Sequence, residues 1–187
     1  GLKEGEAEKK AIELMHQLGI PSAEDAFHYY PHQFSGGMKQ RVMIAMALTC
    51  EPEILIADEP TTALDVTTRA QILDILLSLK EKGGMALLFI THDLATVAGI
   101  ADRIVVMYGG RLAEIGTVHE VFDSPKHPYT QGLLKCLPRI SGSDERLYSI
   151  PGNIPSLIDP PDNCLFSHRC PSVMPVCREK RTPEFVI

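Results

Sequence analysis

Residues 52–60 read Pro-Glu-Ile-Leu-Ile-Ala-Asp-Glu-Pro, an apolar run that ends in two adjacent carboxylates and a proline. Such a run predicts a strand over residues 53–57 that is buried on both faces. Because side chains alternate along a strand, Asp58 and Glu59 are expected to diverge. One carboxylate can then hold a Mg²⁺-bound water while the other faces an attacking water. The alternative is a solvated strand end before Pro60.

The residues that follow complete a strand, helix, strand pattern. Apolar residues recur at helical spacing over Val66–Glu81 and stop at Gly83-Gly84, and a second apolar run covers Met85–Thr91. A connection of this length indicates a βαβ unit, and hence an α/β fold with a parallel sheet covered by helices. The carboxyl ends of the two strands would lie side by side. His92 would then lie near Glu59, where it can contact a γ-phosphate or position a water; a lone histidine more often caps a helix or joins a core.

Upstream, residues 33–41 read Gln-Phe-Ser-Gly-Gly-Met-Lys-Gln-Arg. Ser35 is expected to cap a helix that runs to about Leu48, with Gly36 and Gly37 in its first turn. The free backbone N–H groups and the positive end of the helix dipole favour an anion there, and glycine lets a phosphate approach without a clash. The alternative is an ordinary loop before an N-cap serine.

Further helices and strands are predicted before and after residues 33–92. An amphipathic helix is expected over residues 7–18, and a β-hairpin over residues 103–108 and 111–115. Thr117 and Glu120 form a capping box for a short helix through Phe122. Ten of the 14 prolines follow residue 121, so the tail is expected to be rich in turns.

Composition excludes several classes of protein. The 187 residues are 44% hydrophobic and 22% charged, which is ordinary for a globular protein and excludes a disordered chain or a coiled-coil rod. A net charge of −6 argues against a bulk nucleic-acid binder. No apolar run approaches the length that spans a bilayer. The charged N-terminal residues 1–10 lack the apolar core of a signal peptide, so we expect a reducing compartment and no disulfides.

Taken together, the ordered motifs resemble those of ATP-binding-cassette (ABC) ATPases. The resemblance rests on the signature motif (Ser35–Gly37), the Walker B strand with its catalytic glutamate (Ile54–Glu59), the D-loop (Ala63–Asp65) and the switch histidine (His92). The longer sequence stretches 30–41 and 57–66 resemble those of the subfamily that serves dipeptide and oligopeptide importers. The tail segments His127–Thr130, Ile150–Gly152, Pro155–Leu157 and Asn163–Pro171 resemble the C-terminal extension of those ATPases.

The resemblance implies a role for each matched residue. Two ATPase subunits would face each other head to tail, and Ser35, Gly36 and Gly37 would contact ATP bound to the partner. Asp58 would order Mg²⁺, Glu59 would polarise the attacking water, His92 would contact the γ-phosphate, and Asp65 would carry signals across the dimer. The implied partners are membrane permease subunits and, indirectly, an extracytoplasmic solute-binding protein. The implied location is peripheral, at the cytoplasmic face of the inner membrane.

One departure from the family pattern bears on mechanism. The phosphate-binding loop Gly-x-x-x-x-Gly-Lys-[Ser/Thr] does not occur in the 187 residues, nor does any Gly-Lys pair, and the family's Gln-containing loop has no counterpart. We therefore expect the C-terminal part of such an ATPase, inactive by itself. Residues 1–122 would form a partial ATPase domain, with part of a helical subdomain before the sheet, and residues 123–187 the extension.

Three cysteines in the tail, Cys164, Cys170 and Cys177, are candidate metal ligands. In the family that the tail resembles, four cysteines of the extension can hold a [4Fe–4S] cluster, whereas three occur here and Asn163 stands where glycine is usual. The alternative is a zinc site with His168 as fourth ligand. Cys50 and Cys136 are expected to be ordinary thiols.

Other functions stay open at this point. The solute could be nickel or another small molecule, because selectivity lies in other subunits. A soluble ABC protein acting on DNA or ribosomes would share the catalytic motifs but not the tail. The 187 residues alone could also act as a non-enzymatic interaction or metal-binding module.

Overall fold

The computed structural model describes residues 2–62, 64–137, 148–181 and 183–185. They form two compact units, residues 1–92 and 93–187. The sequence-based division at residues 122 and 123 stays a prediction. No helix within the described ranges is long and apolar enough to cross a membrane.

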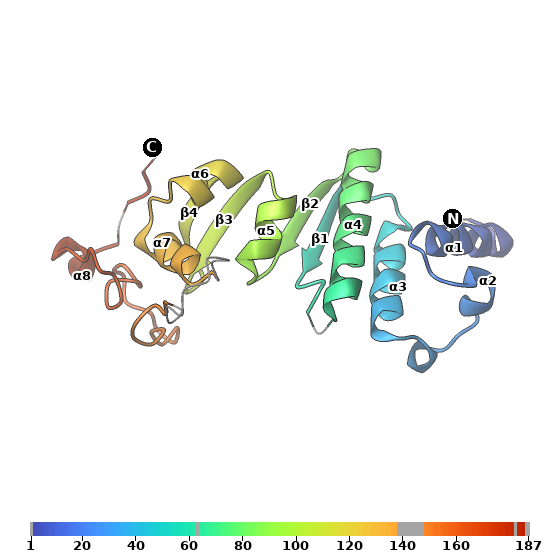
Figure 1. The fold of residues 1–187 in the computed structure, drawn as a ribbon, viewed down its shortest axis with the longest axis horizontal. Coiled ribbons are helices and arrows are strands. Elements are labelled where there is room, and N and C mark those ends of the chain that lie inside the picture. The colour runs from blue at the N-terminus through green and yellow to red at the C-terminus, as the bar shows by residue number, and fades with distance from the viewer. Residues whose placement is uncertain (1, 63, 138–147, 182, 186–187) are drawn as a thin grey trace, which may run out of the picture. The chain divides into compact units, whose positions relative to one another are not determined.

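The first unit begins with helices and continues into a strand, helix, strand unit (Figure 1). Its elements are α1 (Glu4–Gln17), α2 (Ala23–Ala26), the short 3₁₀ helix η1 (Pro31–Gln33), α3 (Gly36–Leu48), β1 (Ile54–Asp58), α4 (Val66–Gly83) and β2 (Ala86–Ile90). β1 and β2 pair in parallel, with Ile54 opposite Ala86 and Asp58 opposite Ile90. The predicted βαβ unit is confirmed, and its boundaries differ from the predicted ones by at most two residues.

The core of this unit lies on one side of the sheet. Leu55 on β1 packs with Ile72 and Leu76 of α4 and with Ile44 and Leu48 of α3. Figure 1 shows α3 and α4 side by side, and the two helices are in contact. The connecting helix α4, together with α3, therefore covers one face of the sheet.

The other face of the sheet is open, which corrects the expectation of strands buried on both faces. The open face carries four large apolar side chains that are 45–63% exposed: Ile54, Ile56, Leu88 and Ile90. Alternation along a strand explains the split, because the helices contact only the odd-numbered positions of the two strands. Parallel sheets are normally covered on both sides.

The second unit is built on an antiparallel hairpin. Its elements are α5 (Leu94–Ile100), β3 (Arg103–Tyr108), β4 (Arg111–Thr117), α6 (Val118–Asp123), α7 (Pro128–Lys135) and α8 (Val176–Glu179). Gly109 and Gly110 both have positive φ, 57° and 75°, as a tight hairpin turn requires. The capping box between Thr117 and Glu120 is also confirmed.

Side chains from both the hairpin and the tail connect these two segments. Arg111 donates to the carbonyl of Asn163 at 2.8 Å. Arg169 donates to the carbonyls of Ile150 and Pro151, at 2.9 and 2.8 Å, and to the Tyr108 hydroxyl. The rings of Tyr108, Tyr129 and Phe166 lie 4.7–5.4 Å apart between centroids. The proline-rich tail thus shares a core with the hairpin.

Candidate functional site

Glu59 and His92 meet at the carboxyl ends of the two parallel strands. Glu59 follows β1 directly, and its N–H donates to the Ile90 carbonyl at 2.9 Å. His92 follows β2, and its Nδ1 lies 2.9 Å from Oε1 of Glu59. The register that pairs Asp58 with Ile90 brings both side chains to the same edge of the sheet. The structure therefore unites two site residues that are 33 positions apart in the sequence.

Thr62 holds the second oxygen of the same carboxylate. Its hydroxyl donates to Oε2 of Glu59 at 2.8 Å, and its N–H donates to the Glu59 carbonyl at 3.1 Å. The hydrogen bonds to His92 and then to Thr62 lower the pKa of Glu59 below its ordinary value. Sequence reasoning missed Thr62. The available signal was a hydroxyl residue three positions after a carboxylate, the spacing of a local side-chain turn.

The adjacent carboxylates of Asp58 and Glu59 lie in different environments. Asp58 ends β1 and is exposed. Glu59 leaves the strand with a left-handed backbone, φ 44°, and turns toward Thr62 and His92. A non-glycine residue in this region carries backbone strain, which the contacts of its N–H, carbonyl and side chain offset. The two groups are thus separated in the way that two different tasks would require.

The signature residues form the start of α3. Ser35 is the N-cap, and its Oγ accepts from the Met38 N–H at 3.3 Å. A Cβ added at Gly36 would meet one side-chain atom of Leu64 at 3.9 Å, which is ordinary contact. Packing within the chain does not require glycine at position 36, so the residue leaves room for a group from outside. The backbone N–H groups of the first turn of a helix can bind an anion.

Asp65 caps α4 rather than standing free. Its Oδ1 accepts from the Thr68 N–H at 2.9 Å, and its Oδ2 accepts from the Thr68 hydroxyl at 2.7 Å. The Thr68 side chain and then its N–H lower the pKa of Asp65 below its ordinary value. The rest of the predicted D-loop includes Ala63, which lies outside the described residues.

The tail cysteines gather in one segment but do not form a metal site among the residues described. The N–H of Cys164 donates to the Cys177 carbonyl at 3.1 Å. Burial raises the pKa of Cys170, and the neighbouring thiols add to that effect. Even so, no three His, Cys, Asp or Glu side chains across the described ranges are arranged to hold a metal ion. His168 is exposed, as is Cys50, and Cys136 donates to the Gly132 carbonyl. The expected iron–sulfur or zinc centre has no support in this arrangement.

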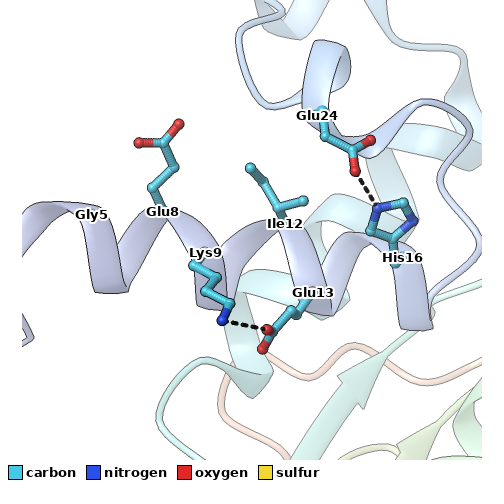
Figure 2. Close-up of a pocket in the computed structure, with 7 residues that line it drawn as sticks. All are labelled: Gly5, Glu8, Lys9, Ile12, Glu13, His16 and Glu24. Atoms are coloured by element: carbon cyan, nitrogen blue, oxygen red, sulfur yellow. Dashed lines mark hydrogen bonds and ion pairs between the residues drawn. The ribbon is translucent and has the colours of Figure 1, made fainter.

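A shallow pocket lies on the outer surface of α1 (Figure 2). Two side-chain pairs line it: an ion pair of Lys9 with Glu13 at 4.0 Å and a hydrogen bond between His16 and Glu24 at 2.8 Å. Figure 2 shows Ile12 and the carboxylate of Glu8 projecting from the same helix. All four paired side chains are more than half exposed, and such pairs contribute little to stability. The pocket is an ordinary charged helix surface.

Two family profiles match the chain. The profile described as "ABC transporter" matches residues 2–62, and the one described as "Oligopeptide/dipeptide transporter, C-terminal region" matches residues 113–177. The first match contains the signature residues, Asp58 and Glu59. The second contains most of the tail, with Cys164 and Cys170 inside it and Cys177 at its end.

Curated relatives agree with both profiles. The dipeptide transport ATP-binding protein DppD of Escherichia coli K12 is 54% identical over 170 residues, which is 91% of this chain and 52% of that protein. DppD of Lactococcus lactis is 50% identical over 187 residues, which is 100% of this chain and 54% of that protein. The chain spans about half the length of the curated relatives it matches.

A solved structure supports the fold. The ATP-binding cassette MJ0796, in a dimeric post-hydrolysis state bound to ADP and Pi, matches with a TM-score of 0.56 and 31% identity, over 63% of this chain and 50% of that one. The predicted α/β fold of a partial ABC ATPase domain is confirmed. With both family profiles and the curated relatives in agreement, the chain belongs to the ATP-binding proteins of the ABC transporter family, and its tail matches the oligopeptide/dipeptide transporter C-terminal region.

Proposed function

We propose that this chain is part of an ATP-hydrolysing subunit that drives import of dipeptides or oligopeptides. The observation that carries the proposal is the hydrogen-bonded group of Glu59, His92 and Thr62 at the ends of two parallel strands. The tail supports the importer branch over a DNA- or ribosome-acting ABC protein, because its match is to a transporter C-terminal region. The named relatives are dipeptide transport proteins.

Glu59 is suited to orient an attacking water. A carboxylate is ionised at neutral pH, and the lowered pKa of Glu59 extends that state to more acidic conditions, so Glu59 accepts a hydrogen bond from a water without first losing a proton. Nδ1 of His92 donates to this carboxylate, so Nε2 can donate to a phosphate oxygen only when the ring carries both protons. Mg²⁺ would neutralise charge on the phosphate oxygens, and Asp58 is the residue that would hold it.

The signature residues would act on nucleotide held by a second ATPase subunit. Ser35 and the N–H groups of Gly36 and Gly37 would contact its phosphates, and the unfilled space at Gly36 supports such an approach. The subunit pair would sit at the cytoplasmic face of the membrane, against permease subunits that receive solute from an extracytoplasmic binding protein.

Substitution of Glu59 in the intact protein tests the proposal. Glu59→Gln should lower kcat for ATP hydrolysis by about 100-fold or more while ATP binding is kept, because water positioning is lost and the phosphate contacts stay. Glu53→Gln, the same change at an exposed residue just before β1, is the matched control. Hydrolysis by Glu59→Gln within about threefold of the unmodified protein would remove Glu59 from this role.

The 187-residue chain alone should show no ATP turnover. It lacks the Gly-x-x-x-x-Gly-Lys loop whose backbone and lysine hold the β- and γ-phosphates. A phosphate-release assay on the purified chain, with Glu59→Gln as its background control, checks this. Turnover that Glu59→Gln abolishes would contradict the prediction.

The identity of the transported solute, dipeptide or oligopeptide rather than nickel, is the most specific part of the proposal. Uptake of labelled dipeptide by the reconstituted transporter, competed by oligopeptides, should depend on ATP, and failure of Ni²⁺ to compete would exclude the nickel alternative. The metal centre in the tail stays a prediction from sequence alone. Iron, sulfide and zinc assays of the intact protein after anaerobic purification would test it, and no step proposed here runs through it.

A further inference from the structure

Gly37 lies so close to α4 that its own chain excludes a side chain there. A Cβ added at Gly37 would lie 2.6 Å from Cγ2 of Thr68, a separation that non-bonded carbons do not reach. At Gly36, by contrast, the nearest atom would be 3.9 Å away. The two signature glycines therefore differ in what requires them. Of the two, only Gly37 is required to be glycine by a contact within the chain.

Thr68 cannot easily turn its methyl group away. Its hydroxyl donates to Oδ2 of Asp65 at 2.7 Å, while its N–H donates to Oδ1. Threonine is branched at Cβ, so rotating χ1 to move Cγ2 would also move the hydroxyl and break its bond to Asp65. The methyl group that faces Gly37 is thus held in place by the cap of α4.

We propose that Thr68 is a positioning residue that joins the Asp65 cap of α4 to the first turn of α3 through Gly37. The proposal rests on the proposed function for the roles of Ser35–Gly37 and Asp65 in hydrolysis. In physical terms, Thr68 fixes the start of α3 relative to the start of α4, so a displacement of Asp65 is transmitted to Gly37. A change at one motif therefore reaches the other within one subunit.

A rescue experiment on the 187-residue chain tests the contact without nucleotide. Gly37→Ala should lower Tm by several degrees, because the new methyl group overlaps Cγ2 of Thr68. Thr68→Ser removes Cγ2 and keeps the hydroxyl, so the double variant Gly37→Ala/Thr68→Ser should regain at least half of the lost Tm. The matched control Gly37→Ala/Thr67→Ser changes the exposed neighbouring threonine and should regain nothing. A double variant that melts at or below Gly37→Ala alone overturns the contact.

A kinetic experiment on the intact protein tests the coupling. Thr68→Val keeps a methyl group at Gly37 and removes the hydroxyl's hydrogen bond to Oδ2 of Asp65, so kcat should fall about fivefold while KM for ATP changes less than about twofold. Thr68→Ser should keep kcat, and Thr67→Val serves as the control for replacing a threonine hydroxyl by a methyl group. Equal kcat for Thr68→Val and the unmodified protein overturns the coupling. If the intact protein lacked ATPase activity altogether, the proposed function would fail, and the thermal experiment would still decide the contact.

Discussion

At the residue scale, the geometry around Glu59 depends on hydrogen bonds from its own turn and from the end of the neighbouring strand β2. Its backbone is left-handed, and three neighbours hold it: Ile90 through the N–H, Thr62 through the carbonyl and Oε2, and His92 through Oε1. Both carboxylate oxygens thus have partners before any substrate binds. A group oriented in this way needs little rearrangement to accept a water, which is how positioned groups contribute to catalysis.

Loss of the Thr62 hydroxyl should weaken this orientation. In the intact protein, Thr62→Val should lower kcat about threefold to tenfold and raise the pKa of Glu59 toward its ordinary value. Because Glu59 is active when ionised, a raised pKa moves the acid limb of the pH–rate profile to higher pH. Thr62→Ser keeps the donor and should behave like the unmodified protein. Identical pH–rate profiles for Val and Ser at position 62 would argue against this role.

At the element scale, α7 depends on a neutral histidine. His127 is the N-cap of this helix, and its Nδ1 accepts from the Tyr129 N–H at 3.0 Å. Burial lowers the pKa of His127 below its ordinary value of 6.5, and nearby Glu114 opposes that shift in part. Glu114 also accepts from the N–H groups of Lys126 and His127. Protonation at Nδ1 would remove the cap acceptor, so the helix start is sensitive to acid.

The second unit should therefore lose stability as the pH falls. An unfolded His127 takes up a proton near pH 6.5, whereas the folded residue does so only at lower pH. Below about pH 6.5 the unfolded state then binds more protons, so the free energy of unfolding decreases as the pH decreases toward the folded pKa. Thermal melts of the chain between about pH 7 and pH 5 should show this loss, and His127→Asn, which caps without titrating, should reduce it. The same pH dependence in both proteins would refute the assignment.

At the scale of the whole molecule, the first unit presents an unusual surface. The open face of the sheet carries Ile54 and Ile56 from β1 and Leu88 and Ile90 from β2, all well exposed. Contiguous apolar patches of this kind mark surfaces that are covered by another segment or protein. We expect this face to be covered in a complete ATPase domain, since the relatives are about twice as long as this chain.

The open face should make the isolated chain bind hydrophobic dyes and self-associate. Ile56→Lys places a charge in the middle of the patch and should reduce both, with little change in Tm, because Ile56 is 63% exposed. Ile72→Ala is the contrast: Ile72 is fully buried in α4, so its truncation should cost about 2–5 kcal/mol of stability. Dye fluorescence, sedimentation velocity and thermal melts check both. Unchanged dye binding by Ile56→Lys would show that the patch is not the binding surface.

Much of this architecture was predictable because its signals are local. The apolar runs around Leu55 and Leu87, the helical spacing between them and the glycine pair at the hairpin each specify an element through neighbouring residues. The parallel pairing also followed, since a strand, helix, strand connection permits few topologies. The parallel pairing in turn predicted that Glu59 and His92 lie close together at one edge of the sheet, as they do. The extent of β4, two residues longer than expected, did not follow, because strand ends depend on pairing partners.

The sequence by itself determined the elements, the order of the motifs and the family, because these follow from residue type and spacing along the chain. Only the tertiary structure decided that His92 bonds to the Glu59 carboxylate, that Thr68 excludes a side chain at Gly37, and that one face of the sheet stays open. It also gave no support to a metal site at the tail cysteines among the described residues. These features depend on distances of a few ångströms between side chains on different elements, which the packing of helices against strands fixes and which no linear pattern encodes.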